Sequence, residues 1–283
     1  MTILVTGGNG QLGSALRLAS AKSSHRYIFT DIAELDITSA EAVDEFVQKN
    51  GIEIVVNCAA YTAVDRAESD EATADRINHK AVATLAAVCA RHNAALIHIS
   101  TDYIFSGEAT APITEEATPA PINAYGRTKW AGEAAIAESG CRAIILRTSW
   151  LYSEFGSNFC KTMRALTATR PEIKVVADQF GTPTYAGDLA GAIVSIIESG
   201  QAEKSGTYNY SNEGACSWYD FAVEIARLSG NNECKIAPCT TSEYPTAAAR
   251  PHYSVLDKSR IKSTFGIEIP EWRESLAKCI KNF

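Results

Sequence analysis

The feature that most constrains this chain is the alternation of short apolar runs with longer helical stretches over residues 1–150. Runs such as Ile54-Val55-Val56 are continuously apolar, as strands buried on both faces of a parallel sheet are. Strands alternating with helices of this length form βαβ units. We predict strands at 2–6, 27–31, 53–57, 95–100 and 141–148, and helices at 11–21, 39–50, 70–93 and 123–139. The sequence therefore predicts an α/β fold with a doubly wound parallel sheet.

A glycine-rich segment, Gly7-Gly8-Asn9-Gly10-Gln11-Leu12-Gly13, joins the first predicted strand to the first predicted helix. Glycines here permit a tight turn and let backbone N–H groups approach a pyrophosphate at the helix N-terminus. A plain strand–helix turn is the alternative, but the order strand, loop, helix favours a dinucleotide site in a Rossmann-type fold. The residues expected at the cofactor are Gly7, Gly10, Gln11, Leu12 and Gly13.

Asp31 ends the second predicted strand, where a carboxylate accepts hydrogen bonds from the adenosine ribose. A 2′-phosphate would face this negative charge, which favours NADH, but the sequence does not decide between NADH and NADPH. Asp36 and Ile37 follow where the chain of such a fold can pass the adenine. The alternative for Asp36 is an ordinary loop residue before the next helix, and both interpretations stay open.

The alternation loosens after Trp150, where prolines separate shorter pieces. We predict a dinucleotide-binding domain at 1–150, to which elements near 173–200 return, and a smaller, mainly substrate-binding lobe at 151–283. The elements predicted there are helices at 159–169, 185–199, 218–228 and 271–281 and a strand at 174–177.

Composition limits the partners that the chain can have. Lys and Arg number 26 and Asp and Glu 33, so the formal net charge is −7. Such a chain has no general attraction for nucleic acid or an anionic membrane, and its apolar runs are too short to span a bilayer. The eight cysteines form no Cys-x-x-Cys pair. We expect free thiols in a cytoplasmic protein without a metal site; a half-site at Cys234 and Cys239 is the alternative.

Tyr125 stands four positions before Lys129 in a predicted helix, so both side chains lie on one face. Thr101 and Asp102 follow the fourth predicted strand, at the edge where ligands bind in open α/β sheets. A tyrosine has a free pKa of about 10, and a nearby ammonium stabilises its phenolate. Taken alone, the Tyr–Lys spacing is typical of solvated helix faces. With the glycine loop and Thr101 it predicts a site for hydride and proton transfer.

The chain also resembles a known family, the extended short-chain dehydrogenases/reductases that act on nucleotide sugars, and within it the dTDP-4-dehydrorhamnose reductases. The resemblance covers nearly the whole chain. The stretches that carry it are 7–13, 56–65 with Ala67-Glu68, 100–105, 125–129 with Gly132-Glu133, 147–152, Asn158-Phe159, 178–184 and 250–252. The long middle motifs are specific to this reductase group.

The resemblance implies reduction of the C4 ketone of dTDP-4-dehydro-L-rhamnose to dTDP-L-rhamnose with NADPH or NADH, and a possible homodimer. It makes Tyr125 the proton donor, Lys129 its partner and a ribose ligand, and Thr101, Asp102 and Trp150 contacts of the nucleotide-sugar substrate. It adds Ala60, Tyr61 and Thr62 to the residues that line the dinucleotide. Tyr61 is a departure, because some relatives carry His there.

Trp150 and Arg250 each have a structural and a functional interpretation. Trp150 is either a platform for the sugar or a core aromatic at a strand end. Arg250, in Arg250-Pro251-His252, is either a bidentate contact of the diphosphate or a surface arginine. His98 lies inside an apolar strand, and we expect a core histidine whose polar atoms are satisfied.

Two other functions compete with the reductase. A 4,6-dehydratase would need an acid where this chain has Tyr103, and the motifs of an epimerase match less well. A non-catalytic dinucleotide-binding regulatory subunit, like that of methionine adenosyltransferase, would have no chemical need of Thr101, Tyr125 and Lys129 together.

Overall fold

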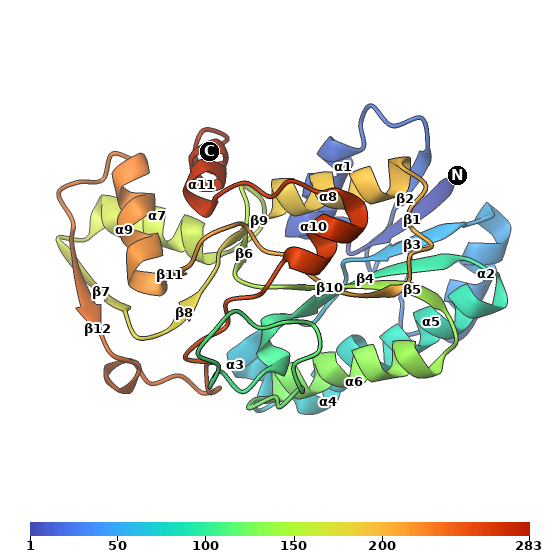
Figure 1. Ribbon diagram of the computed structural model, residues 1–283, viewed down its shortest axis with the longest axis horizontal. Helices are drawn as coiled ribbons and strands as arrows, with labels where there is room; N and C mark the ends of the chain where they lie inside the picture. Colours follow the sequence, from blue (N-terminus) through green and yellow to red (C-terminus); the bar gives the residue numbers. More distant parts are fainter.

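A six-stranded parallel sheet forms the centre of the protein, whose computed structural model describes residues 1–283 (Figure 1). Its strand order is β10-β5-β4-β3-β1-β2. The strands are β1 (Thr2–Thr6), β2 (Arg26–Phe29), β3 (Ile54–Asn57), β4 (Ala95–Thr101), β5 (Arg142–Thr148) and β10 (Gly206–Asn209). The order runs outward from β1 and β3 in both directions, so the predicted doubly wound sheet is confirmed.

Helices cover both faces of this sheet, as Figure 1 shows. One layer holds α1 (Gln11–Ala19), α8 (Ala186–Glu198) and α10 (Ser259–Phe265); the other holds α2 (Ala40–Asn50), α5 (Ala81–Arg91) and α6 (Ala124–Glu138). In β1, Ile3 and Val5 pack against the first layer and Leu4 against the second. Burial on both faces is why these strands carry no polar alternation.

The predicted long helix at 70–93 is divided into three segments. They are α4 (Glu71–Asp75), a π-helical turn η1 (Arg76–Lys80) and α5. The wide turn carries Asn78, which is buried and clamps the backbone of Tyr61: Oδ1 accepts from its N–H at 2.9 Å, and Nδ2 donates to its carbonyl oxygen at 3.1 Å. Single π turns are frequent at functional sites, and this one fixes the loop after β3.

A second, smaller lobe has its own core. The helices α7 (Phe159–Thr169), α9 (Trp218–Leu228) and α11 (Trp272–Ile280) pack around Phe221 and the fully buried Trp272. Three strand pairs complete it: β7 (Glu172–Val176) with β12 (Lys235–Cys239), β8 (Phe180–Gly181) with β11 (Cys216–Ser217), and β6 (Leu151–Tyr152) with β9 (Thr184–Tyr185).

The elements after residue 150 are shared between the sheet domain and the smaller lobe. Of the segment 173–200, α8 lies on the sheet, whereas β7 pairs within the lobe. The pattern did not predict β10 or α10, which also join the sheet domain. We propose a first domain of residues 1–150 with α8, β10 and α10, and a lobe formed by the remaining elements.

The close approach of α6 to the π turn provides a test of this packing. A Cβ on Gly132 would lie 2.2 Å from the carbonyl oxygen of Asn78, whereas a Cβ on Gly191 in α8 would meet no atom within 4 Å. We predict that Gly132→Ala lowers the free energy of unfolding by about 1–3 kcal/mol, because the helices must move apart. The matched control Gly191→Ala should raise it by about 0.5–1 kcal/mol. Urea denaturation measures both, and equal effects would contradict the packing.

Candidate active site

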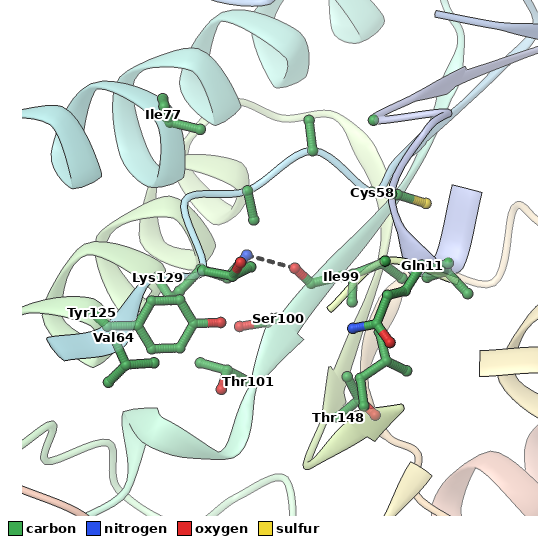
Figure 2. Close-up of a pocket in the computed structure, with 18 of the residues that line it drawn as sticks. Gln11, Cys58, Val64, Ile77, Ile99, Ser100, Thr101, Tyr125, Lys129 and Thr148 are labelled. Atoms are coloured by element: carbon green, nitrogen blue, oxygen red, sulfur yellow. Dashed lines mark hydrogen bonds between the residues drawn. The ribbon is translucent and has the colours of Figure 1, made fainter. Parts of the chain in front are cut away.

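A cavity of about 970 Å³ is lined by the carboxyl ends of the central strands and by parts of the smaller lobe. Most residues predicted to bind cofactor or substrate line it. They are Gly7, Gly10, Gln11, Leu12, Asp31, Asp36, Ile37, Ala60, Thr62, Thr101, Asp102, Tyr125, Lys129 and Trp150. Figure 2 shows part of this set, with Tyr125, Lys129 and Thr101 grouped beside β4 and Gln11 across the cavity from them.

The glycine loop has the close packing that a dinucleotide cradle needs. A Cβ on Gly13 would lie 2.3 Å from the carbonyl oxygen of Gly7, and one on Gly7 would lie 2.7 Å from the backbone nitrogen of Ala59. Gly13 itself does not line the cavity; it lets α1 start close against the loop. The backbone can therefore approach a pyrophosphate at the N-terminus of α1, which fits a dinucleotide.

The two acids predicted to bind the cofactor differ in their bonding. Asp31 accepts hydrogen bonds from the backbone N–H groups of Asn9, at 3.1 Å, and of Ile32, at 2.9 Å. Asp36 accepts from the backbone N–H and the hydroxyl of Thr38, and these bonds hold the pKa of Asp36 below its usual value. Asp36 is therefore both a loop-forming residue and part of the cavity wall.

Lys129 is almost completely buried, with 2% of its surface exposed. Its ammonium donates a hydrogen bond to the carbonyl oxygen of Ile99 at 2.6 Å, drawn as a dashed line in Figure 2. Burial lowers the pKa of Lys129 to about 8, although Glu133 and Cys58 act in the opposite direction. The pKa of Lys129 therefore lies close to neutral pH.

Tyr125 is held as a neutral phenol. Burial raises its pKa to about 12; the hydroxyl of Thr101 acts to lower it and Asp102 to raise it. The ammonium of Lys129 donates to the carbonyl oxygen of Ile99 in β4. The expected stabilisation of the Tyr125 phenolate by the Lys129 ammonium stays a prediction. A phenol with a raised pKa is protonated at neutral pH, as the donor in a carbonyl reduction must be.

Asp102 is the most unusual acid of the site. It is 1% exposed, and its Oδ2 has no hydrogen-bond partner, while Oδ1 accepts from the hydroxyl of Thr101 at 3.2 Å. Burial raises its pKa to about 6. The hydroxyl of Ser254 acts to lower this pKa, and the contact of Asp102 with a substrate stays a prediction.

Trp150 and Trp218 form a stacked pair on the lobe side of the cavity, with ring centroids 3.5 Å apart and planes 12° apart. The backbone of Trp150 has φ +47°, a left-handed conformation that costs a bulky residue energy and that tends to persist at functional sites. A Cβ on Gly181 would lie 2.7 Å from the Trp150 ring. The structure therefore presents Trp150 as part of the cavity wall and not as an ordinary core aromatic.

Two other predicted residues lie outside the cavity lining. Tyr61 packs, as Tyr125 does, against the cluster of Ala67, Ala74 and Ala124, and its hydroxyl is buried without a partner. Arg250 donates to Asp65 at 2.7 Å and to the carbonyl oxygen of Ala248 at 3.1 Å. Its guanidinium lies 5.9 Å from the ring centre of Tyr103. In this structure Arg250 therefore ties the 246–252 segment to α3 (Val64–Ala67), and its expected contact with a diphosphate stays a prediction.

A buried ion pair, between two residues noted above only as parts of resembling stretches, supports α6. Arg147 of β5 is 4% exposed and Glu133 of α6 is 3% exposed. Nη2 of Arg147 lies 2.7 Å from Oε2 of Glu133, and Nε lies 3.1 Å from both carboxylate oxygens. The hydroxyl of Ser100 also donates to Glu133. The pair fixes the helix that carries Tyr125 and Lys129 to the neighbouring strands.

Other lining residues escaped prediction because no local pattern marks them. Trp218 begins α9, and its place beside Trp150 depends on how the lobe folds. Ser157 and Arg76 likewise line the cavity from irregular or wide turns. Asn158 was noted only as part of a resemblance; its amide donates to Oε1 of Gln11 at 2.8 Å, which joins the lobe to the glycine loop.

The Rossmann-type sheet, the glycine cradle and the grouped Thr101, Tyr125 and Lys129 are those of a short-chain dehydrogenase/reductase. Residues 1–283 match the family model described as RmlD substrate binding domain, and the chain belongs to this family.

Known relatives are similar to this chain over nearly their full lengths. The chain is 38% identical to a dTDP-4-dehydrorhamnose reductase of Aggregatibacter actinomycetemcomitans, covering 97% of this chain and 96% of the relative. A solved dTDP-4-dehydrorhamnose reductase of Clostridium acetobutylicum is 44% identical, with a TM-score of 0.95 and coverage of 100% and 99%. One from Bacillus anthracis, in complex with NADP, is 39% identical, with the same TM-score and coverage.

The buried carboxyl of Asp102 generates a stability prediction. Its pKa is raised from 3.8 to about 6, so its ionised form opposes folding above pH 6, and this penalty disappears as the pH falls below 4. We predict that Asp102→Asn raises the free energy of unfolding at pH 7 by about 1–3 kcal/mol.

Denaturation at pH 7 and pH 4 measures the effect, and most of the gain should be lost at the lower pH. The control is Asp178→Asn. Burial acts to raise the pKa of Asp178, but hydrogen bonds from Thr241 outweigh it and leave the pKa low. This control should therefore be destabilising at pH 7. A destabilised Asp102→Asn variant would contradict the assignment.

Proposed function

We propose that this protein reduces the C4 ketone of dTDP-4-dehydro-L-rhamnose (dTDP-6-deoxy-L-lyxo-4-hexulose) to dTDP-L-rhamnose with NADPH or NADH. The observation that carries the proposal is the grouping of Thr101, Tyr125 and Lys129 in the cavity that also holds the glycine cradle. Full-length similarity to reductases of this name supports the choice of substrate.

The chain's own residues supply binding and proton transfer, and the bound NAD(P)H supplies the hydride. The phenol of Tyr125 donates its proton to the oxygen at C4 as the ketone becomes an alcohol. Lys129 stabilises the phenolate that remains until solvent reprotonates it. Thr101 positions the reacting oxygen with its hydroxyl. Asp102 and Trp150 contact the sugar, with Trp218 beside Trp150.

The cradle residues bind the dinucleotide, with Asp31 at its ribose and the segment 60–62 along its edge. We further propose a cytoplasmic location, to which eight free cysteines are suited. No helix of the structure is long and apolar enough to cross a membrane. A homodimer, and the absence of nucleic-acid and membrane partners, stay predictions from the sequence.

The reaction is tested with purified protein, the 4-keto sugar nucleotide and NAD(P)H. We expect cofactor absorbance at 340 nm to fall and the product to co-elute with dTDP-L-rhamnose. Tyr125→Phe should lower kcat by about 10²–10⁴ with nearly unchanged cofactor affinity, because only the proton donor is lost. More than a tenth of wild-type turnover in the variant would remove Tyr125 from this role. Tight cofactor binding by the wild type without any consumption would favour the regulatory subunit.

Cofactor choice is tested at Asp31, whose carboxylate would face a ribose 2′-phosphate. We predict that Asp31→Ala raises the ratio of kcat/KM for NADPH to that for NADH. The ratio is the proper measure, since loss of the bond to Asn9 weakens both cofactors alike. Asp36→Ala is the matched control: Asp36 lines the same cavity, but its carboxylate is bonded to Thr38, so the ratio should change less. An unchanged ratio for Asp31→Ala would mean that this acid does not face the ribose.

A further inference from the structure

A line of buried polar side chains runs across β1, β3 and β4 and ends at Lys129. Thr6, Asn57 and His98 are directly paired in register on β1, β3 and β4, so their side chains share one face. The Thr6 hydroxyl lies 2.7 Å from the Asn57 amide, which lies 3.0 Å from Nδ1 of His98. Nε2 of His98 lies 3.3 Å from Nζ of Lys129. All four residues are at most 2% exposed.

Such a line destabilises the fold unless each polar group has a hydrogen-bond partner. Buried polar atoms in a low-dielectric interior cannot form hydrogen bonds with water instead. Neighbouring residues on these strands, among them Val5, Val56 and Ile97, are apolar. His98 contributes nothing to the hydride or proton transfer proposed above, since it does not line the cavity, whereas Lys129 does. Its contact with the ammonium of Lys129 calls for another role.

The donors and acceptors of the line determine the state of His98. Burial, followed by the charge of Lys129, lowers the pKa of His98 well below its usual value, so the ring is neutral and carries one hydrogen. The Asn57 nitrogen faces Nδ1; if it donated there, the ring hydrogen would be on Nε2. That hydrogen would then meet the ammonium of Lys129, which has no lone pair.

A half-turn of the Asn57 amide removes this conflict. The two ends of the amide have nearly the same size, so hydrogen bonding decides its orientation. With its oxygen toward Nδ1–H, the amide nitrogen donates to the Thr6 hydroxyl, which both donates and accepts. Nε2 then presents its lone pair to Lys129.

We propose that His98 is a positioning residue for Lys129: held as the Nδ1–H tautomer by Asn57, it accepts a hydrogen bond from the ammonium through Nε2. With the carbonyl oxygen of Ile99 as the second acceptor, this leaves the third hydrogen of the ammonium for the cavity. The proposal rests on the reductase activity proposed above and assigns a further residue to it.

The bond has a consequence for pH dependence. An acceptor bonds the charged ammonium more strongly than the neutral amine and so favours the charged form, which lets His98 maintain the ammonium at neutral pH. The other groups that act on the ammonium are Glu133 of α6 and Cys58 after β3. Lys129 is the charged group that acts on His98. Loss of the Nε2 acceptor should lower the pKa of Lys129, which stands at about 8, by about one unit for an ordinary hydrogen bond to a charged group.

The tautomer is tested on the wild-type protein with NADPH bound. In ¹⁵N-histidine-labelled protein, imidazole nitrogen shifts show which nitrogen carries the hydrogen, and His98→Gln assigns the signal. We expect a neutral ring with Nδ1–H between pH 6 and 7.5. A hydrogen on Nε2, or a charged ring, would overturn the proposal whatever the variants do.

The kinetic test compares pH profiles of kcat. His98→Leu removes the acceptor, so the alkaline limb should move to lower pH by about one unit and kcat at pH 8 should fall several-fold. His98→Gln restores an acceptor near the position of Nε2 and should recover most of the shift. The matched control is His92→Leu, because His92 bonds Asp44 at 2.9 Å and does not line the cavity. Its profile should equal that of the wild type.

An unshifted limb in His98→Leu, or a shift to higher pH, would overturn the positioning role. A loss of kcat without any shift, equal in the Leu and Gln variants, would show that His98 only supports the fold and would also overturn it. Failure of the reductase proposal can be told apart from failure of the His98 proposal. The wild type would then consume no NAD(P)H with the 4-keto sugar, while the imidazole signals would still report the tautomer of His98.

Discussion

The buried ion pair between Arg147 and Glu133 holds the catalytic helix to the sheet. Two charges removed from water are compensated only by good geometry and further hydrogen bonds, and removal of one partner typically costs about 3–5 kcal/mol. Here the guanidinium meets both carboxylate oxygens, and the Ser100 hydroxyl adds another donor. Because Glu133 stands one helical turn after Lys129, the pair fixes the face of α6 that carries Lys129 and Tyr125 against β4. The placement of the proposed proton donor depends on this contact.

The sheet domain could be predicted largely from sequence because its signals are local. Each strand of the first half is an apolar run, and α2 has a capping residue at each end, with the Ser39 side chain accepting from Ala42 and Gly51 at φ +58°. β10 gives no such signal, since Gly-Thr-Tyr-Asn is short and half polar and becomes a strand by pairing with β5 at the sheet edge. The π turn at Arg76–Lys80 is also invisible in the pattern, because its helical periodicity hardly differs from that of the helices around it.

The candidate site likewise contains residues that local motifs predict and residues that only the fold brings together. Gly7–Gly13, Thr101, Tyr125 and Lys129 belong to short motifs whose spacing carries a mechanism, and all but Gly13 of the residues predicted from them line the cavity. Trp218 reaches the cavity only through the packing of the lobe. The salt bridge of Arg250 to Asp65 joins residues far apart in the chain, so no local pattern could predict it. His98 was expected to be a satisfied core histidine; its contact with Lys129 depends on the side chains that strand register brings together.

Trp150 also constrains how sequences of this fold can diverge. Its ring occupies the space that any side chain at position 181 would need. An alanine at 181 therefore requires a smaller residue at 150, or a displaced ring that would no longer stack on Trp218. The two positions are separated along the chain but cannot change independently. A pair of compensating substitutions there would mark members in which the lobe side of the cavity has been rebuilt.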